Sequence, residues 1–330
     1  MEFQLSREAL LRVLNHVSSI VDSRSTISIL SNLYIKCENN QIEIRSTDMD
    51  ISIKEFVSAD STKNGEATVN ARIFTDIIRK TKKNTIIKLK NEGNRLTINS
   101  ENSVFELNSL SAEEFPKFVP LDKENSFELN VEQIKKIFTK TKFAISSEET
   151  RYYLNGVYFH TVKSDEKNIL KAVATDGHRL AKTELVISSS IEIEGIILPR
   201  KFILQLDKIL GDFEGKIKIV CSETQVSFEA DNFVIISKLI DGKFPDYEKV
   251  IPVSNDKFLE VESEPFFNAI DRISTVNQDK TPTIKLAFDN NSIKIMASST
   301  ESNKGDEEVP ANYTSSPLEI LFNSKYLLDL

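Results

Sequence analysis

The chain is poor in the residues from which catalytic and cofactor sites are usually built. Its 330 residues include nine glycines, two cysteines, three histidines (His16, His160 and His178) and no tryptophan. No H-E-x-x-H, paired C-x-x-C, Walker A or G-x-G-x-x-G motif occurs, and so few glycines argue against a glycine-rich phosphate loop. We therefore expect no metal, no cofactor and no catalytic residue.

The two cysteines and the absence of long apolar runs limit where the protein works. Cys37 and Cys221 lie far apart in strand-like runs, which is typical of buried thiols in a reducing cytosol. No run reaches the roughly 18 apolar residues of a membrane span. The start Met-Glu-Phe-Gln lacks a basic segment followed by an apolar one, as a secretory signal would have. We expect a cytoplasmic protein with no membrane partner.

The net charge of −8 argues at first against nucleic acid, but the charges are segregated. Arg72–Lys83 carries five basic residues and one acid, and Val131–Lys142 carries four lysines and one acid; Arg7 and Arg12 add to the first helix. Acids concentrate elsewhere, as in Glu301–Glu308. A segregated positive surface attracts phosphate, whereas solvated helix faces give the same pattern without a ligand. Charge alone leaves both interpretations open.

Two landmarks recur along the chain. The first landmark occurs at Phe3–Leu11, Phe127–Ile134 and Phe258–Ser263. The second is shared by Val69–Phe74, Leu198–Ile203 and Phe322–Leu327. The offsets are 124 and 131 for the first landmark and 129 and 124 for the second. A repeat of this length is a whole small domain, since solenoid units span roughly 20–50 residues. The sequence predicts three tandem domains, at residues 1–122, 123–252 and 253–330.

The repeat also predicts that the third copy is incomplete. Leu330 corresponds to Leu206 of the second copy, which continues to about Pro252. We expect a third domain shorter by about 46 residues, with an unpaired sheet edge.

Each repeat reads as two halves, each with an amphipathic helix followed by strands. In the first helix, Ser6 is the expected N-cap, and the expected apolar stripe consists of Leu10, Leu11, Leu14, Val17 and Ile20. Asn130 with Gln133 forms a capping-box pattern on the matching helix. A second helix is expected at Ile73–Thr81, and strands are expected at Leu33–Cys37, Gln41–Ser46, Ile51–Val57, Thr85–Lys90, Arg95–Ser100 and Ser103–Ser109. The pattern predicts an α+β fold with antiparallel sheets and helices on one face.

The one dense polar cluster is Ala174–Ala181. Asp176 and His178 are two members of a possible hydrolase triad, but no matching nucleophile stands out. Asp-Gly between two strand-like runs instead favours a hairpin turn. A hydrolase and a three-domain scaffold with no DNA role are the alternative hypotheses.

The run Ala-Thr-Asp-Gly-His-Arg-Leu-Ala resembles the signature of the bacterial sliding clamps, the beta subunits of DNA polymerase III. Further segments match that family in order: Ile27–Leu33, Thr47–Asp50, Glu114–Pro116, Arg151–Val157, Leu198–Lys201 and Asp241–Tyr247. The family's closing segment near Met-Pro-Met is absent. The resemblance implies a non-catalytic processivity factor: a homodimeric ring of six domains, with helices around the hole and sheets outside, that holds duplex DNA of any sequence.

The resemblance and the charge pattern together give three candidate sites. The DNA-facing candidates are Arg24, Arg72, Arg79, Lys80, Arg151, Tyr152, Tyr153, Arg200 and Lys201. Among them, Arg24 and Arg151–Tyr153 match family positions, and the others rest on helix charge. The candidates for a pocket that takes short linear motifs of polymerases, the clamp loader and repair proteins are Leu154, Thr175, Gly177, His178, Arg179, Leu180, Pro245, Lys249 and Val250. Relatives can carry arginine where this chain has Lys249. The dimer-interface candidates, argued from strand alternation and the third repeat's first helix, are Phe105, Leu107, Ile270, Ile273 and Val276.

Overall fold

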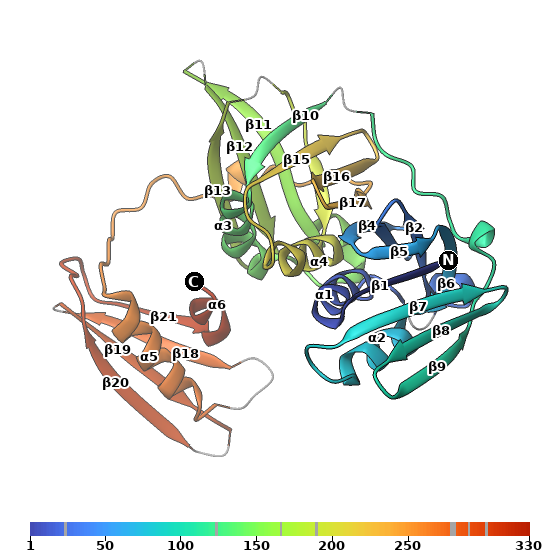
Figure 1. Cartoon of the computed structure of the whole chain (residues 1–330). Helices are drawn as coiled ribbons and strands as arrows, with labels where there is room; N and C mark the ends of the chain where they lie inside the picture. The colour runs from blue at the N-terminus through green and yellow to red at the C-terminus, as the bar shows by residue number, and fades with distance from the viewer. Residues whose placement is uncertain are drawn as a thin grey trace. The chain divides into compact units, whose positions relative to one another are not determined.

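The computed structural model describes residues 1–22, 25–122, 125–165, 167–188, 191–277, 282–289, 291–300 and 303–330. It divides into two compact units, Met1–Phe244 and Pro245–Leu330, which we describe separately (Figure 1). No helix among the described residues is long and apolar enough to cross a membrane.

The first repeat supplies two helices and nine strands. The helices are α1 (Arg7–Val17) and α2 (Ala71–Lys80). The strands are β1 (Glu2–Ser6), β2 (Asn32–Glu38), β3 (Gln41–Thr47), β4 (Ile51–Ser58), β5 (Asp60–Lys63), β6 (Gly65–Asn70), β7 (Ile86–Glu92), β8 (Arg95–Ser100) and β9 (Ser103–Asn108). Two short 3-10 helices, η1 (Ser28–Ser31) and η2 (Ala112–Glu114), flank them. The expected helices and strands are present, with ends shifted by one or two residues, except that α1 ends at Val17 and Ile20 of the expected stripe lies beyond it.

The second repeat follows the same order. Its helices are α3 (Val131–Thr141) and α4 (Arg200–Leu210), with 3-10 helices η3 (Lys142–Ala144) and η4 (Glu149–Leu154). Its strands are β10 (Ser126–Asn130), β11 (Gly156–Ser164), β12 (Lys167–Thr175), β13 (Leu180–Ile187), β14 (Ile196–Pro199), β15 (Lys216–Cys221), β16 (Gln225–Ala230) and β17 (Phe233–Lys238).

Local capping explains where these helices begin. The Ser6 hydroxyl accepts a hydrogen bond from the Ala9 amide at 3.2 Å, and the Asn130 amide donates to Gln133 Oε1 at 2.8 Å. Both interactions satisfy amides that a helix start leaves without intrahelical partners. The two predicted caps are confirmed. Asn39 and Asn40 both have positive φ, at 50° and 62°, as a tight hairpin between β2 and β3 requires.

Three antiparallel sheets form the first unit. Their strand orders are β5-β1-β7-β8-β9, β10-β15-β16-β17-β4-β3-β2-β6 and β13-β12-β11-β14. The central sheet joins both repeats, because β4 of the first pairs with β17 of the second, with Ile53 opposite Ile235. This shared sheet, which we call the junction, makes one compact unit of two repeats.

The helices of the first unit pack as a continuous row in the order α2-α1-α4-α3 (Figure 1). Each buries an apolar side against one continuous core that includes Leu14, Phe74, Phe138 and Phe202, all fully buried. Burying such side chains contributes about 1.5–3 kcal/mol each before conformational entropy is subtracted. The row therefore leaves the opposite, polar side of each helix free for another role.

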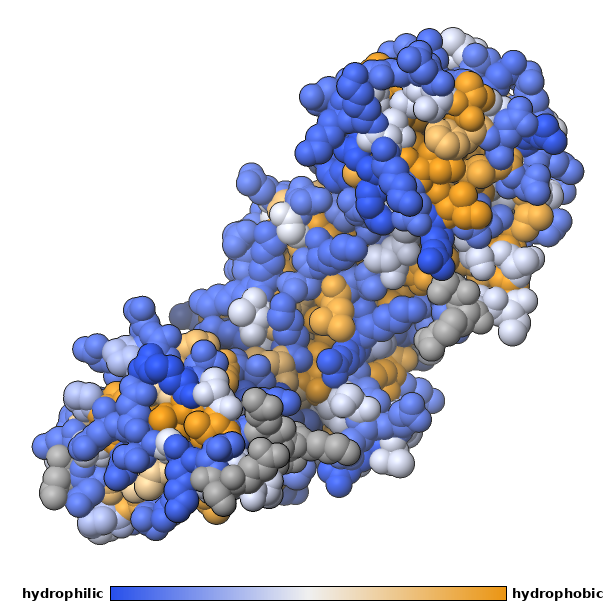
Figure 2. All heavy atoms as spheres, turned by 90° about the horizontal axis from the view of Figure 1, so that it is seen from below, coloured by the Kyte–Doolittle hydropathy of each residue, from blue (hydrophilic) through white to orange (hydrophobic). Residues whose placement is uncertain are grey.

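The second unit holds the third repeat. It contains η5 (Tyr247–Val250), α5 (Ser263–Ser274), β18 (Thr283–Asp289), β19 (Ser292–Ser298), β20 (Lys304–Pro310), β21 (Leu318–Asn323) and α6 (Ser324–Leu328). The strands form one antiparallel sheet in the order β20-β19-β18-β21, whose core includes Ile270, Ile284 and Ile295. Edge strand β21 leaves Leu321 65% exposed. Apolar side chains also break the mostly hydrophilic surface seen in Figure 2.

Candidate nucleic-acid and partner interface

The helix row carries cations that no carboxylate neutralises. Seven exposed basic side chains on α1 to α4 have no ion-pair partner within the described part of the chain: Arg12, Arg72, Lys80, Lys136, Lys140, Arg200 and Lys208. Three of them, Arg72, Lys80 and Arg200, belong to the predicted DNA-facing set. The charge pattern also pointed to the helices that carry Arg12, Lys136 and Lys140, but the candidate set omitted these residues. Lys208, which donates to the Asn15 carbonyl at 3.2 Å, was missed.

Other basic residues on the row are already paired. Arg79 Nη1 lies 2.9 Å from Asp76, and Lys142 Nζ lies 2.6 Å from Asp207. Lys201 is ion-paired with Asp48 across the junction. A cation that is paired with a carboxylate attracts phosphate less than an unpaired one. A count of basic residues therefore overstates the positive electrostatic potential of the helix row.

The structure corrects the sequence interpretation of Arg7. It was counted with the surface charge, but it is only 8% exposed. Its Nε donates to the Ile78 carbonyl at 3.1 Å and its Nη2 donates to the Arg79 carbonyl at 2.7 Å. The side chain thus satisfies carbonyl groups at the end of α2 and stabilises the negative end of that helix. We remove Arg7 from the candidate surface.

The Arg151–Tyr153 segment is held in η4 by backbone bonds on both sides. The Ser146 amide donates to the Leu154 carbonyl at 3.1 Å, and the Arg200 amide donates to the Asn155 carbonyl at 2.9 Å. Arg151 is exposed and lies 3.4 Å from Glu148; Tyr152 is 53% exposed and meets Tyr153 edge-on. Arg24, the other residue that matches a family position, lies outside the described residues.

Asp176 organises the turn between β12 and β13. Its Oδ1 accepts hydrogen bonds from the amides of His178 and Arg179, both at 3.0 Å. Its Oδ2 accepts from Arg179 Nε at 3.0 Å. Both carboxylate oxygens of Asp176 are therefore engaged in hydrogen bonds within the turn, so this acid has a structural role there. The predicted hairpin turn is confirmed, since β12 and β13 pair up to Thr175 and Leu180.

Further contacts fix the shape of this turn. Thr175 Oγ1 donates to the Arg179 carbonyl at 2.7 Å, and Arg179 Nη2 donates to the Phe143 carbonyl at 2.6 Å. Gly177 has φ +87°, and a Cβ there would lie 2.8 Å from Arg151 Nη1. The positive backbone angle favours glycine at this position, because residues with a Cβ rarely adopt it. The turn and Arg151 are thus neighbours.

The predicted pocket residues differ in accessibility. In the first unit, Leu154 is 4% exposed, Leu180 is half-buried and His178 is exposed. In the second unit, Val250 is 69% exposed and Lys249 lies 2.9 Å from Asp246. The Asp246 carboxylate raises the pKa of Lys249, so this amine stays protonated at neutral pH.

The predicted dimer-interface residues also divide into two kinds. Phe105, 37% exposed, and half-buried Leu107 lie on the edge strand β9. Ile270 and Ile273 instead pack inside the second unit's own core, at 1% and 8% exposure. Helical periodicity marked them as apolar but did not say which surface they cover. Val276 is half-buried beside Gly305 of β20.

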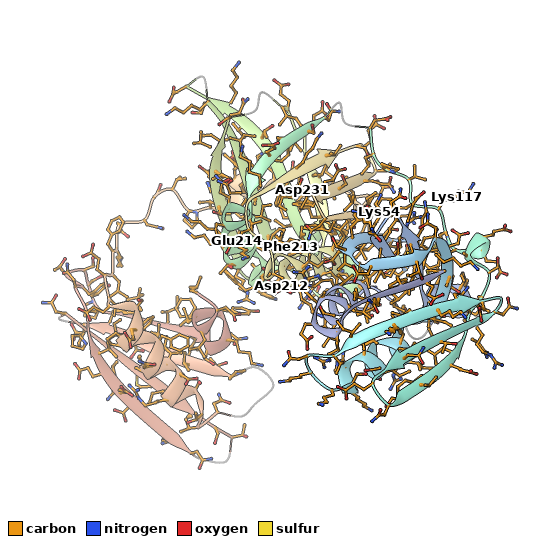
Figure 3. The ribbon with its side chains drawn as sticks, in the orientation of Figure 1. Lys54, Lys117, Asp212, Phe213, Glu214 and Asp231 are labelled. Carbon is orange, nitrogen blue, oxygen red and sulfur yellow. The ribbon has the colours of Figure 1, made fainter. Side chains whose placement is uncertain are left out.

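The junction contains a polar cluster that sequence reasoning missed. His16 is 2% exposed; its Nδ1 lies 3.0 Å from Glu55 Oε2 and its Nε2 lies 3.0 Å from Asp212 Oδ2. Figure 3 labels Asp212 and Phe213, the ring that packs on His16. The three groups come from positions 39 and 196 residues apart, so no local motif could identify them.

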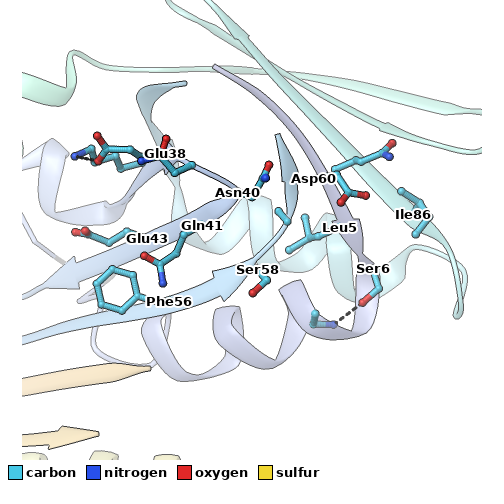
Figure 4. A pocket seen from close by; sticks show the side chains of 15 residues that line it. Leu5, Ser6, Glu38, Asn40, Gln41, Glu43, Phe56, Ser58, Asp60 and Ile86 are labelled. Atoms are coloured by element: carbon cyan, nitrogen blue, oxygen red, sulfur yellow. Dashed lines mark hydrogen bonds and ion pairs between the residues drawn. The ribbon is translucent and has the colours of Figure 1, made fainter. Parts of the chain in front are cut away.

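A polar groove of about 800 Å³ opens where β1 meets β3 and β4 (Figure 4). Its lining includes Gln41, Glu43, Phe56, Ser58 and Asp60. Carboxylates, amides and one aromatic ring line it without a convergent set of donors, so its chemistry does not resemble an anion or nucleotide site. None of the unpaired cations of the helix row lines this groove.

Comparison with known proteins identifies the relatives of this chain. Three family models match: DNA polymerase III beta subunit, N-terminal domain over residues 1–119, central domain over residues 128–246 and C-terminal domain over residues 248–330. A beta sliding clamp of Caulobacter vibrioides is 37% identical over 333 residues, covering 100% of this chain and 90% of the relative. One of Haemophilus influenzae is 33% identical over 331 residues, covering 100% and 89%.

Solved structures agree with these sequence matches. The sliding clamp of Bartonella birtlesii bound to griselimycin has a TM-score of 0.95 and 38% identity, with 100% of this chain and 89% of that chain covered. The Caulobacter crescentus clamp, with polyethylene glycol bound to a putative beta-motif tethering region, has a TM-score of 0.92 and 36% identity, with 100% and 88% covered.

Proposed function

The chain belongs to the beta sliding clamp family, the beta subunit of DNA polymerase III, and we propose that its helix row is the surface that faces DNA. It is a non-catalytic clamp that keeps the polymerase on its template. A clamp of this kind works by topology, since a closed ring cannot leave circular DNA whatever the sequence. The three domains are assigned to residues 1–122, 123–252 and 253–330.

The observation that supports the DNA-facing surface is the set of unpaired cations along α2-α1-α4-α3. Seven such groups lie on one continuous row in a protein whose net charge is −8. Lysine and arginine contacts to phosphate release counterions and carry no base information. The row therefore supports binding to duplex DNA of any sequence, with an affinity that falls steeply as salt rises.

Arg151, Tyr152 and Tyr153 extend this surface in our proposal, together with Arg24, Arg79 and Lys201. Arg151 is exposed, and Tyr152 offers an exposed ring beside it. Because Lys201 and Arg79 already have carboxylate partners, we expect them to contribute less than Arg200 and Arg72.

The turn of β12 and β13 is the proposed partner site. Its shape is fixed by Asp176, and its exposed members are Gly177 and His178. A glycine of this conformation lets a partner backbone approach closely, and an apolar side chain such as Leu180 suits an anchor of a short linear motif. The solved Caulobacter crescentus clamp holds polyethylene glycol at a putative beta-motif tethering region, and the Bartonella birtlesii clamp is bound to griselimycin, which supports a ligand site of this kind. The proposed partners are the polymerase catalytic subunit, the clamp loader and repair proteins.

A homodimer is the proposed assembly, and the cytoplasm its proposed location. Phe105 and Leu107 on the edge strand β9 would meet the third repeat of a second copy, with Val276 as the remaining candidate there. An edge strand offers unpaired backbone groups as well as side chains, which suits a contact between subunits.

Retention on circular DNA tests the whole proposal. The chain is loaded on nicked circular DNA by its clamp loader, and the complex is separated by gel filtration before and after linearisation. We expect retention on the circle, loss after cutting, and no dependence on sequence. Equal retention on linear DNA would support simple electrostatic binding and contradict the clamp mechanism.

A further inference from the structure

The junction between the first two repeats has a defined strand register. There β17, the last strand of the second repeat, pairs antiparallel with β4 of the first. Ile235 lies opposite Ile53 on the side of the sheet that faces the core, and both side chains are fully buried. Ile236 lies opposite Ser52 on the other side of the sheet. The same pairing can serve as a template wherever the counterparts of these two strands are both edge strands.

The strand β9 is the counterpart of β17 in the first repeat. The strand order β1-β7-β8-β9 repeats the order β10-β15-β16-β17. The hairpin of β8 and β9 also matches the hairpin of β16 and β17 residue for residue. Phe105 therefore takes the position of Ile235, and Glu106 takes the position of Ile236.

The strand β20 is the counterpart of β4 in the third repeat. The strand order β20-β19-β18-β21 repeats the order β4-β3-β2-β6. The last residue of β4 pairs with the first residue of β3, and the last residue of β20 pairs with the first residue of β19, which fixes the alignment. Gly305 therefore takes the position of Ile53, and Lys304 takes the position of Ser52. Among the described residues, β9 and β20 are both edge strands (Figure 1).

We propose that β9 pairs antiparallel with β20 of a second copy of the chain, in the register of the junction. Phe105 then lies opposite Gly305, and Glu106 lies opposite Lys304. The proposal rests on the homodimer proposed above and specifies its contact, because it states which strands pair, in which direction and with which residues opposite each other. A two-fold axis makes the same contact twice.

The inner side of this contact matches a large side chain to a glycine. Phe105 is accessible on β9, with 37% of its surface exposed. On β20, a Cβ at Gly305 would lie 3.4 Å from side-chain carbons of Ile273 and Val276, so the absent side chain leaves space beside two apolar groups. The junction fills the equivalent place with two isoleucines. In the contact between subunits, the ring of Phe105 supplies the volume that glycine lacks.

A charged pair beside the strand is repeated as well. Arg272 has the position in α5 that His16 has in α1, and Glu307 has the position in β20 that Glu55 has in β4. Arg272 donates to Glu307 from Nε at 3.1 Å and from Nη2 at 2.5 Å, and His16 Nδ1 lies 3.0 Å from Glu55. In both repeats a basic side chain of the helix orients the carboxylate of the strand. The equivalence of β20 and β4 therefore extends to their side chains.

The outer side of the contact joins opposite charges. Lys304 is exposed, and no carboxylate lies within ion-pair distance of it in the described part of the chain. Glu106 is also exposed; Arg95 Nη1 lies 2.7 Å from its Oε2, and its Oε1 can accept from a second cation. Opposite charges that face each other on paired strands attract, and like charges repel. The pair therefore favours this register over one shifted along the strand.

Charge reversal tests the register, with dimerisation of the whole chain measured by sedimentation velocity over a concentration series. Glu106→Lys and Lys304→Glu each place two like-charged pairs in the dimer, so we expect the dissociation constant to rise roughly tenfold or more. An equimolar mixture of the two variants should dimerise as the parent does, because each contact of the mixed dimer again joins opposite charges. Lys88→Glu is the matched control: it reverses an exposed charge on β7, two strands away from β9, and should leave the dissociation constant unchanged.

The outcomes separate the register from the homodimer itself. A mixture that is no more dimeric than either variant alone would show that local damage weakens the dimer, and the register would be wrong. Single variants that dimerise like the parent would also overturn the register, while leaving the homodimer intact. A parent chain that stays monomeric at every concentration would instead refute the homodimer, and this contact with it.

Discussion

Lys201, in the first turn of α4, is ion-paired with Asp48, which precedes β4 in the other repeat. The Asp48 carboxylate is itself fixed, since its Oδ1 accepts hydrogen bonds from the amides of Asp50 at 3.0 Å and Ile51 at 2.7 Å. Two sequence landmarks of the family thus meet at the junction. The pair also distinguishes Lys201 from its neighbour Arg200, which is exposed and unpaired among the described residues.

Arg200→Gln should therefore weaken DNA binding more than Lys201→Gln. Each phosphate contact contributes about 0.9 to the slope of log affinity against log salt, so we expect Arg200→Gln to lower that slope by about that amount. Lys201→Gln should lower it by less, because its charge is partly neutralised by Asp48. Fluorescence anisotropy with duplex DNA over a salt series measures both slopes. Lys216→Gln, an exposed lysine on β15, is the control, and equal effects of the two variants on α4 would contradict the assignment.

The same dependence of DNA binding on salt applies to Arg151, which lies in η4 and not on the helix row. Arg24→Gln combined with Arg151→Gln should lower the salt slope by less than about 1.8, the sum of two full contacts, because Glu148 already partly neutralises Arg151. Retention on circular DNA should fall in parallel, for every sequence tried. A variant that binds one sequence preferentially would show that these residues read bases instead of phosphates.

Asp176 and His178 should behave differently when each is changed to alanine. Asp176→Ala removes three hydrogen bonds that order the turn, so we expect a loss of about 1–3 kcal/mol in unfolding free energy. His178→Ala changes an exposed side chain and should stay within about 0.5 kcal/mol of the parent. Urea denaturation measures both. Only His178→Ala is a clean test of the partner site, where we expect weaker binding of a motif peptide with the fold intact; unchanged affinity would remove it from that site.

Local rules predicted much of this fold, and long-range contacts account for the rest. The caps at Ser6 and Asn130 and the turn at Asn39-Asn40 follow from side chains a few residues apart. The pairing of β4 with β17 joins segments about 180 residues apart, and periodicity says nothing about it. A strand pattern shows which face is apolar but not which strand becomes its neighbour.

The candidate site shows the same division. The signature run identified the turn around Asp176, and the charge pattern identified the basic helices. Neither revealed that Arg7 bonds to the end of α2 or that Lys201 has a carboxylate partner. Ile270 and Ile273 read as apolar helix positions, but only packing shows that their own core covers them.

His16 should contribute to stability mainly through Glu55. Glu55 is fully buried and its Oε1 has no hydrogen-bond partner among the described residues, whereas the Asp212 side chain is 52% exposed. His16→Ala leaves a buried carboxylate without its partner, so we expect a loss of about 3–5 kcal/mol in unfolding free energy. Asp212→Asn should cost less than about 1 kcal/mol, since water can replace the lost contact. Urea denaturation distinguishes the two, and equal losses would show that Glu55 has another partner.

Cys221 should be unreactive in the folded chain. Burial raises the pKa of its thiol to about 12, and burial also raises that of Cys37. The folded thiol keeps its proton where an unfolded thiol loses it near 9, so stability should fall as pH rises above 9. Dithionitrobenzoate at pH 8 should label neither cysteine until urea unfolds the chain. Rapid labelling of Cys221 under native conditions would contradict the packing of β15.

Phe105→Ala should weaken the proposed dimer. Phe105 projects from the edge strand β9 with 37% of its surface exposed, so its ring is accessible to a partner surface. An aromatic side chain at the centre of an interface contributes about 2 kcal/mol or more, so we expect the dissociation constant to rise roughly thirtyfold. Val186→Ala is a matched control, because Val186 is 57% exposed on β13, the edge strand of another sheet. Sedimentation velocity over a concentration series measures both variants. If Val186→Ala weakens the dimer and Phe105→Ala does not, the subunit contact lies on the sheet of β13 instead of on β9.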